Sequence, residues 1–142
     1  MKKKSINIPN LPAPEASFSR AMKISIGNAE MLFISGTASI GPNRETLYPD
    51  DFEKQARHTY ENVEDILKSE GMGSSDVVKW TVFLKDMKYY DRFEKVRAAV
   101  FVEQGIPREL LPASTAIQAT LCREALLIEM ECIALKQSDV RS

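Results

Sequence analysis

The sequence predicts an α+β fold in which two helices pack on one face of a mixed sheet, with elements in the order ββαβαββ. Apolar residues follow a helical period in only two segments, residues 52–67 and 90–104. The remaining apolar segments are short, and their alternating or β-branched side chains are typical of strands. Because crossovers between strands are right-handed, both helices are expected on the same face of the sheet.

The first half of the chain predicts a strand hairpin followed by a helix. Residues 21–26 alternate between apolar and polar side chains, and a Gly-Asn pair supplies a turn to the apolar run 31–35. The proline-containing residues before this hairpin are expected to form an extended arm. The first helical segment follows and stops at Gly71, because glycine commonly ends helices.

The second half predicts three strands around the second helix. Residues 76–86 are apolar on both sides, as in a strand with both faces covered. The helix at 90–104 ends at a Gly-Ile-Pro stop, and strands at 114–121 and 125–135 follow, joined by a short turn. No linker or repeat interrupts this order, so we expect one domain over residues 1–142.

Composition excludes several classes of function. The 19 basic and 20 acidic residues give a net charge of -1, so a nucleic-acid partner is not expected. No apolar run is long enough for a signal peptide or a membrane span, which predicts a cytoplasmic protein without a membrane partner. Cys122 and Cys132 are too few for a zinc site. We expect no metal and no cofactor, and two free thiols with Cys132 in the core.

The last two strands predict a sheet with two unlike faces. Side chains along a strand point alternately to its two faces. On the final strand, every second residue from Ile128 to Ala134 therefore points inward. The residues between them point outward, namely Leu127, Glu129, Glu131 and Ile133. The same parity on the preceding strand puts Ser114, Ala116 and Gln118 beside the glutamates. Bulky apolar residues mixed with carboxylates on a face without helices predict partial burial against another subunit.

Several motifs together resemble the RidA/YjgF family over nearly the whole chain. They are A-P-E-A-S-F-S-R-A, F-I-S-G-T-A-S-I-G-P, V-V-K-W-T-V-F-L-K-D-M, P-A-S-T and L-I-E-M-E-C-I-A, in this order. The resemblance implies a chorismate-mutase-like fold and a homotrimer that binds a small molecule in clefts between subunits. It also implies hydrolysis of reactive enamines and imines, such as 2-aminoacrylate, to a 2-keto acid and ammonia.

The resemblance further implies which residues form the site. Glu129 takes the position of the acid that holds a water molecule. Contacts with the ligand are implied at positions along the chain from the N-terminal arm to the P-A-S-T motif, namely Phe18, Gly36, Lys88, Ser114, Thr115 and Ala116. A half-buried carboxylate can act as a general base, but Glu129 pairing with a basic residue across the interface is an equally open interpretation. Ser114 and Thr115 are expected to form a polar rim of the cleft, and a cap at the start of their strand is the alternative.

One position departs from the family pattern. The deaminating members carry an arginine where this chain has Ser114, and that arginine grips the substrate carboxylate through two charge-assisted hydrogen bonds, each worth about 1.5–3 kcal/mol. Serine offers one neutral hydrogen bond, so weak activity on α-imino acids is expected unless another cation, such as Arg108, replaces it. A ligand-binding or regulatory trimer without turnover and a chorismatase-like enzyme are the alternatives.

Overall fold

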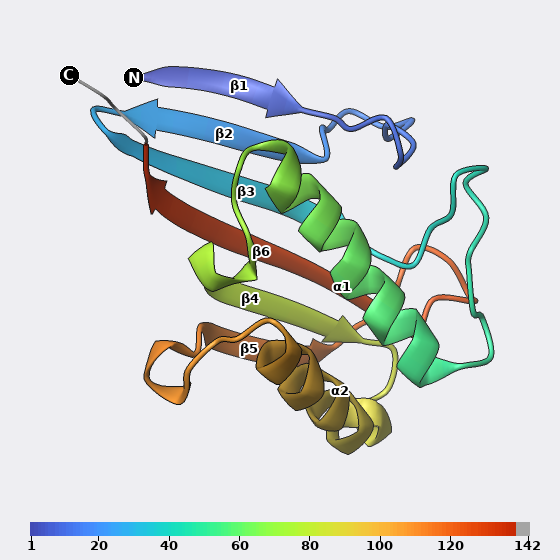
Figure 1. Ribbon diagram of the computed structural model, residues 1–142. Coiled ribbons are helices and arrows are strands. Elements are labelled where there is room, and N and C mark those ends of the chain that lie inside the picture. Colours follow the sequence, from blue (N-terminus) through green and yellow to red (C-terminus); the bar gives the residue numbers. More distant parts are fainter. Residues whose placement is uncertain (139–142) are drawn as a thin grey trace.

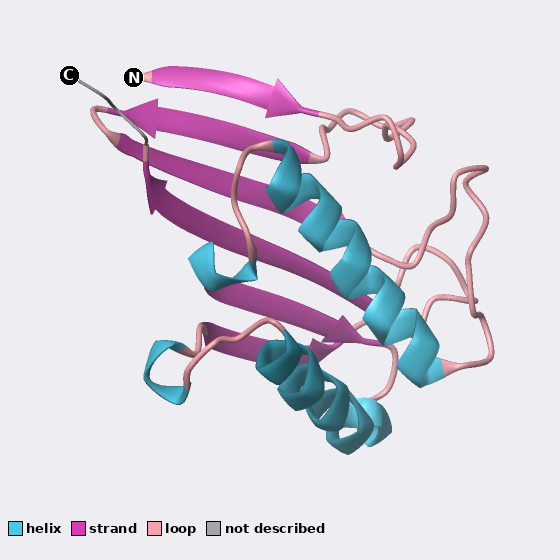
Figure 2. Cartoon of the chain, viewed as in Figure 1, coloured by secondary structure: helices cyan, strands magenta, loops and turns pink. Residues whose placement is uncertain are grey.

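A computed structural model describes residues 1–138 of the chain, and over these residues the predicted α+β fold is confirmed. One mixed sheet carries both helices, α1 (Phe52–Ser69) and α2 (Tyr90–Glu103), on the same face (Figures 1 and 2). Its strands lie in the order β1-β2-β3-β6-β4-β5. Their bounds are β1 (Lys2–Ile6), β2 (Ala21–Ile26), β3 (Ala29–Thr37), β4 (Val77–Leu84), β5 (Ala113–Gln118) and β6 (Ile128–Gln137).

The N-terminal residues form a strand where an arm was predicted. Strand β1 pairs antiparallel with β2, from Lys2 opposite Ser25 to Ile6 opposite Ala21. The sequence of β1 shows no alternation of apolar and polar residues. Only Ile6 of this strand is buried, and its lysines lie in solvent at the edge of the sheet. Lysines on an edge strand discourage pairing with a further chain. The extended arm is therefore confined to the residues between β1 and β2.

Local capping explains where α1 begins and ends. Helix α1 starts after Asp51, whose carboxylate accepts a hydrogen bond from the Lys54 amide, and stops before Gly71, whose φ of +69° suits glycine. Short 3-10 helices, η1 (Ser74–Asp76), η2 (Met87–Tyr89) and η3 (Arg108–Leu110), flank the strands and α2. Trp80 of β4 and Phe93 of α2 are almost completely buried in the core between the sheet and the helices. None of the described helices has the length and apolar character needed to cross a bilayer.

Strand β6 lies between β3 and β4 and pairs antiparallel with both. The predicted inward set of this strand is confirmed, since Ile128, Met130, Cys132 and Ala134 are all buried. The connection from β5 to β6 is longer than the short turn expected, because β5 stops at Gln118 and β6 starts only at Ile128. The loop 119–127 between them carries the exposed Cys122, and both cysteines are free thiols, as predicted.

The predicted orientation of β5 is wrong. This strand runs parallel to β4, with Ser114 opposite Trp80 and Ala116 opposite Val82. Residues opposite each other point to the same face, and both β4 residues are buried beneath the helices. Ser114, Ala116 and Gln118 therefore face the helix layer, whereas Thr115 and Ile117 share the open face with the two glutamates. The sequence pattern of β5 predicted the wrong orientation for two reasons. Its one large apolar residue, Ile117, stays exposed, and its small polar residues do not distinguish a buried face from an exposed one.

The open face of the sheet is broadly apolar. Phe33 on β3 lies opposite Ile133 on β6, and Met31 lies opposite Leu135. Large apolar side chains remain exposed on the strands of this sheet, namely Ile26, Phe33, Val78, Ile117 and Leu135. Leu127, which was also expected here, packs partly against the core instead.

Candidate functional site

A hollow of about 360 Å³ opens where β3 ends and β6 begins. It brings together Phe18, Gly36 and Glu129, three of the residues implied by the resemblance. The arm before β2, the segment after β3 and the loop 119–127 complete its wall, with Pro14, Glu15, Ala16, Arg20, Ala38, Ile40, Arg44, Cys122, Arg123 and Leu126. The hollow thus joins three connections that are far apart in the sequence.

Gly36 lets the carboxylate of Glu129 lie against the backbone of β3. A Cβ atom at this position would stand 2.6 Å from Glu129 Oε2, closer than van der Waals contact allows. The register of β3 against β6 shifts between Ile34 and Thr37, so the irregularity falls at the glycine. Glycine is therefore required here to place the acid.

Glu129 is more basic than an ordinary glutamate. Partial burial, followed by the negative charge of Glu131, raises the pKa of its carboxyl group. Among the ion pairs of residues 1–138, none involves Glu129, so no cation within this part of the chain holds it in the ionised form. A carboxyl group in this state can take a proton from water and return it to a leaving group.

Three arginines, which the sequence interpretation did not assign, line the same hollow. Arg20 is 9% exposed, and its guanidinium donates to the carbonyl oxygen of Pro12. Burial first, and then the charges of Arg44 and Arg123, lower its pKa. Arg123 Nη1 donates to the carbonyl oxygen of Arg44 at 2.6 Å. They escaped notice because each lies in a loop or at a strand boundary, where arginine is ordinary.

Ser114 lies apart from this hollow within the chain. Its Oγ accepts a hydrogen bond from Arg97 Nη1 at 2.9 Å, and Arg97 also pairs with Glu94 at 2.7 Å. Both Ser114 and Arg108 line a different cavity of about 410 Å³ on the helix side, between α2 and β5, where Trp80 and other apolar side chains form part of the wall. The expectation that Ser114 stands beside the glutamates of its own chain is thus wrong.

The other implied contacts also lie outside the Glu129 hollow. Thr115 is on the open face and accepts a hydrogen bond from Lys79 Nζ at 2.7 Å. Ala116 packs partly against the core. Lys88 is exposed on η2, with its ammonium 5.5 Å from the centre of the Tyr89 ring. Contact of these residues with a ligand remains a prediction, and within one chain they do not meet Glu129.

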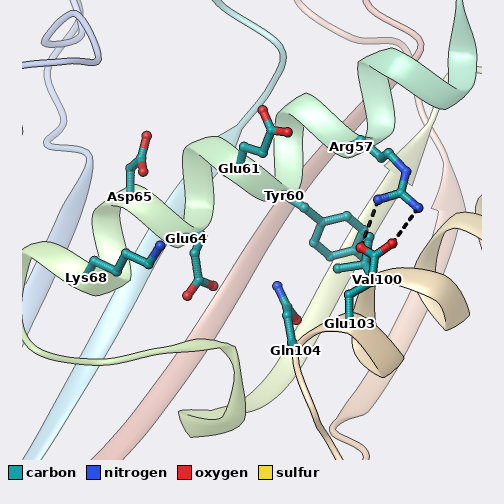
Figure 3. A pocket seen from close by; sticks show the side chains of 9 residues that line it. All are labelled: Arg57, Tyr60, Glu61, Glu64, Asp65, Lys68, Val100, Glu103 and Gln104. Atoms are coloured by element: carbon teal, nitrogen blue, oxygen red, sulfur yellow. Dashed lines mark hydrogen bonds and ion pairs between the residues drawn. The ribbon is translucent and has the colours of Figure 1, made fainter.

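A further hollow separates the two helices (Figure 3). Arg57 of α1 and Glu103 of α2 close one side of it through two hydrogen bonds of 3.0 and 3.2 Å. The side chains of Glu61 and Asp65 point away from Glu103, toward the outer side of α1. None of the site residues implied by the resemblance lines this hollow. The Arg57–Glu103 pair links α1 to α2 across it, which is typical of a solvated groove.

Comparison with known proteins gives the family. A family model described as Endoribonuclease L-PSP matches residues 8–136. A RutC family protein of Pyrococcus horikoshii is 35% identical, covering 95% of this chain and 99% of the relative. The 2-iminobutanoate/2-iminopropanoate deaminase of Escherichia coli is 28% identical over 94% of this chain and 98% of that enzyme.

Solved structures agree with this relationship. The YjgF gene product of E. coli has a TM-score of 0.79 and 28% identity, with coverage of 94% of this chain and 99% of that one. E. coli TdcF with bound serine has the same TM-score of 0.79 at 25% identity, covering 94% of this chain and 99% of that one. With a family model over most of its length and relatives that match it end to end, the chain belongs to the RidA/YjgF family.

Proposed function

We propose that the protein hydrolyses reactive imines or enamines of small metabolites at the Glu129 hollow. The observation that carries this proposal is the half-buried carboxyl group of Glu129, held over Gly36 with a raised pKa. The similarity to the E. coli deaminase, whose name states the same chemistry, supports it. Phe18, Ile40 and Leu126 give the hollow an apolar lining for the rest of the molecule.

In the proposed reaction, ionised Glu129 accepts a proton from a water molecule as the water oxygen bonds to the carbon of a C=N group. The electron pair of that double bond moves to nitrogen. Glu129 then returns the proton to nitrogen, which gives a carbinolamine with a hydroxyl and an amino group on the same carbon. Glu129 next takes the hydroxyl proton and passes it to the amino nitrogen as the C–N bond breaks, so that a ketone and ammonia result. An enamine enters the same route after a proton adds to its β-carbon, which gives the imine. Water and the imine are the only reactants consumed, and no cofactor is required.

We further propose that the protein acts as a homotrimer with each cleft built from two chains. The support is the apolar open face of the sheet, where Phe33, Ile117 and Leu135 are exposed in a single chain. Association would remove this surface from water. A partner could also bring its own Ser114, Thr115 and Ala116 to the Glu129 hollow, which one chain alone does not do.

The test couples an amino-acid oxidase, which makes imines, to the added protein. Semicarbazide traps the imine, so an active protein lowers semicarbazone formation and raises the yield of free keto acid. Glu129→Gln should lose the effect, because an amide cannot accept the proton, by about a hundredfold or more. Glu131→Gln, on the same strand, is the matched control and should retain it. Wild-type protein with no effect on any imine would contradict the proposal.

Binding without turnover is the second candidate function. It is favoured by the structure of TdcF with bound serine, a relative described with a ligand that is not an imine. A ligand that raises the melting temperature of the wild-type protein and of Glu129→Gln equally, without any hydrolysis, would identify this function.

A further inference from the structure

We infer that Arg20, Arg44 and Arg123 form a binding subsite for a carboxylate in the Glu129 hollow, supplying from the loops the charge that Ser114 does not supply. The inference rests on the proposed function and narrows its substrate class. The three arginines line the same hollow as Glu129, Gly36 and Phe18. Ligands would be small 2-imino or 2-keto acids whose apolar side chain contacts the apolar part of the wall.

The positive charges of the three arginines are poorly balanced by carboxylates. Arg44 pairs with Glu15 at 3.0 Å, but the Glu15 side chain is 76% exposed, so solvent weakens that pair. Arg20 and Arg123 form no ion pair with any residue of the described part of the chain. A buried guanidinium without a carboxylate is unfavourable, and the neighbouring arginines add repulsion. A bound anion would relieve both effects.

The arginines are also held in place before a ligand arrives. Nε and Nη2 of Arg20 donate to the carbonyl oxygen of Pro12, and Nη1 of Arg123 donates to that of Arg44. Nη1 of Arg44 donates to the carbonyl oxygen of Ala13 at 2.8 Å. Backbone carbonyls thus fix one side of each guanidinium. Arg44 Nε pairs with Glu15, and Arg123 Nη1 also donates to Thr46 Oγ1 at 3.4 Å. Among residues 1–138, Arg20 Nη1 and the Nε–Nη2 edge of Arg123 have no partner, so they are available to bind a carboxylate. The Arg123 edge suits the two-bond contact typical of arginine.

The position of the acid relative to the arginines fits an amino-acid-like molecule. Glu129 has its pKa raised by burial and by Glu131, and no arginine appears among the causes of that shift. Glu129 also forms no ion pair with the three arginines, so the acid and the guanidinium groups are not occupied by one another. A 2-imino acid carries its carboxylate next to its C=N carbon, so it would contact Glu129 and the arginines in the same hollow.

The rival cations lie on the other side of the sheet. Arg97 already pairs with Glu94 and with Ser114 Oγ, and Arg108 lines the cavity between α2 and β5. Neither lines the Glu129 hollow of its own chain. Arg108 is therefore the matched control for Arg123, since both are exposed arginines in connecting segments.

The experiment measures binding and turnover separately. Arg123→Gln, Arg44→Gln and the double variant are compared with Arg108→Gln for their affinity toward 2-oxobutanoate, a stable keto acid, by calorimetry. We expect each single variant to bind about tenfold more weakly or worse, with Arg108→Gln unchanged. The exposed positions of Arg123 and Arg44 make folded variants accessible, and circular dichroism checks this.

Turnover of two imines then identifies what the arginines recognise. One imine comes from a neutral amino acid through an amino-acid oxidase, and the other comes from an uncharged primary amine through an amine oxidase. The arginine variants should raise KM about tenfold or more for the first imine and leave the second unchanged, whereas Glu129→Gln should abolish turnover of both.

The outcomes separate this inference from the proposed function. Keto-acid binding that depends on Arg123 and Arg44, with no hydrolysis of any imine, would support the subsite and refute the hydrolase. Wild-type affinity in the double variant would overturn the subsite even if hydrolysis continues. Loss of binding in Arg108→Gln instead would move the carboxylate contact to the helix side or to a partner subunit.

Discussion

Glu129 couples the chemistry of the site to the stability of the fold. Its pKa in the folded chain lies above the ordinary carboxyl value because burial and Glu131 disfavour the charged form. The protonated form is therefore the more compatible with folding. The stabilisation is complete below the unfolded pKa, and it is lost as pH rises through the folded pKa.

Glu129→Gln should consequently remove activity and at the same time raise the melting temperature at neutral pH. The difference from wild type should shrink as pH falls below the ordinary carboxyl pKa, where the carboxyl group becomes protonated in both states, and grow above it. Thermal unfolding between about pH 4 and 8 measures it. A variant less stable than wild type at pH 7 would contradict the stated origin of the pKa shift.

Glu131 should act on the same carboxyl group from a distance. Glu131→Gln removes the second cause of the raised pKa, so the pKa of Glu129 should fall. The acidic limb of the pH–rate profile should then move to lower pH, with little change in the maximal rate. An unmoved limb would mean that Glu129 is not the base seen in the profile.

Gly36→Ala should impair the site while leaving the fold largely intact. The three atoms nearest to the new Cβ all belong to the Glu129 side chain, with Oε2 at 2.6 Å, so the carboxylate must move away. Gly73→Ala is the control, since its nearest neighbour would be Glu64 Oε1 at an ordinary 3.7 Å. Hydrolysis rates of both variants measure the effect on the site, and melting curves measure the effect on the fold. We expect activity to drop about tenfold or more in Gly36→Ala, because small misplacements of a catalytic group are costly.

At the scale of the elements, long periodic segments were predictable and weakly patterned ones were not. Helix α1 and the inward residues of β6 follow from apolar spacing that contrasts sharply with polar neighbours. Strand β5, with the sequence A-S-T-A-I-Q, has no such contrast. Its parallel register with β4 decides which of its residues face the helices. Strand β1 was missed because its lysines point to solvent. The arginines of the hollow come from separate connections, so only the assembled fold shows them together.

Strand β1 should contribute to stability chiefly through its last residue. Ile6 is 4% exposed and belongs to the core, so Ile6→Ala should destabilise the protein by about 2–5 kcal/mol. Lys3→Ala in the same strand removes an exposed side chain and should change stability by about 0.5 kcal/mol or less. Denaturant unfolding of the two variants tests whether the strand is paired in solution. Equal stabilities would argue that it is not.

At the scale of the whole molecule, the two faces of the sheet differ in how they are covered. One face is covered by α1 and α2 (Figure 2). The other face exposes Phe33, which lies opposite Ile133. If three chains share this surface, Phe33→Glu should yield monomers that remain folded, because burying a charge there opposes association but costs the single chain little. Val102→Glu, on the exposed side of α2, should leave the trimer intact. Light scattering with circular dichroism reports both. A wild-type monomer would refute the assembly.

The two cysteines give the chain a pair of chemically distinct labels. Cys122 is exposed in the wall of the Glu129 hollow, whereas burial raises the pKa of the Cys132 thiol to about 12. Since alkylating reagents attack the thiolate, Cys122 should react in the native protein and Cys132 only when the chain opens. The rate at Cys122 then reports occupancy of the hollow, and the rate at Cys132 reports unfolding. One mass spectrum of a single alkylated sample would read both events on the same molecules.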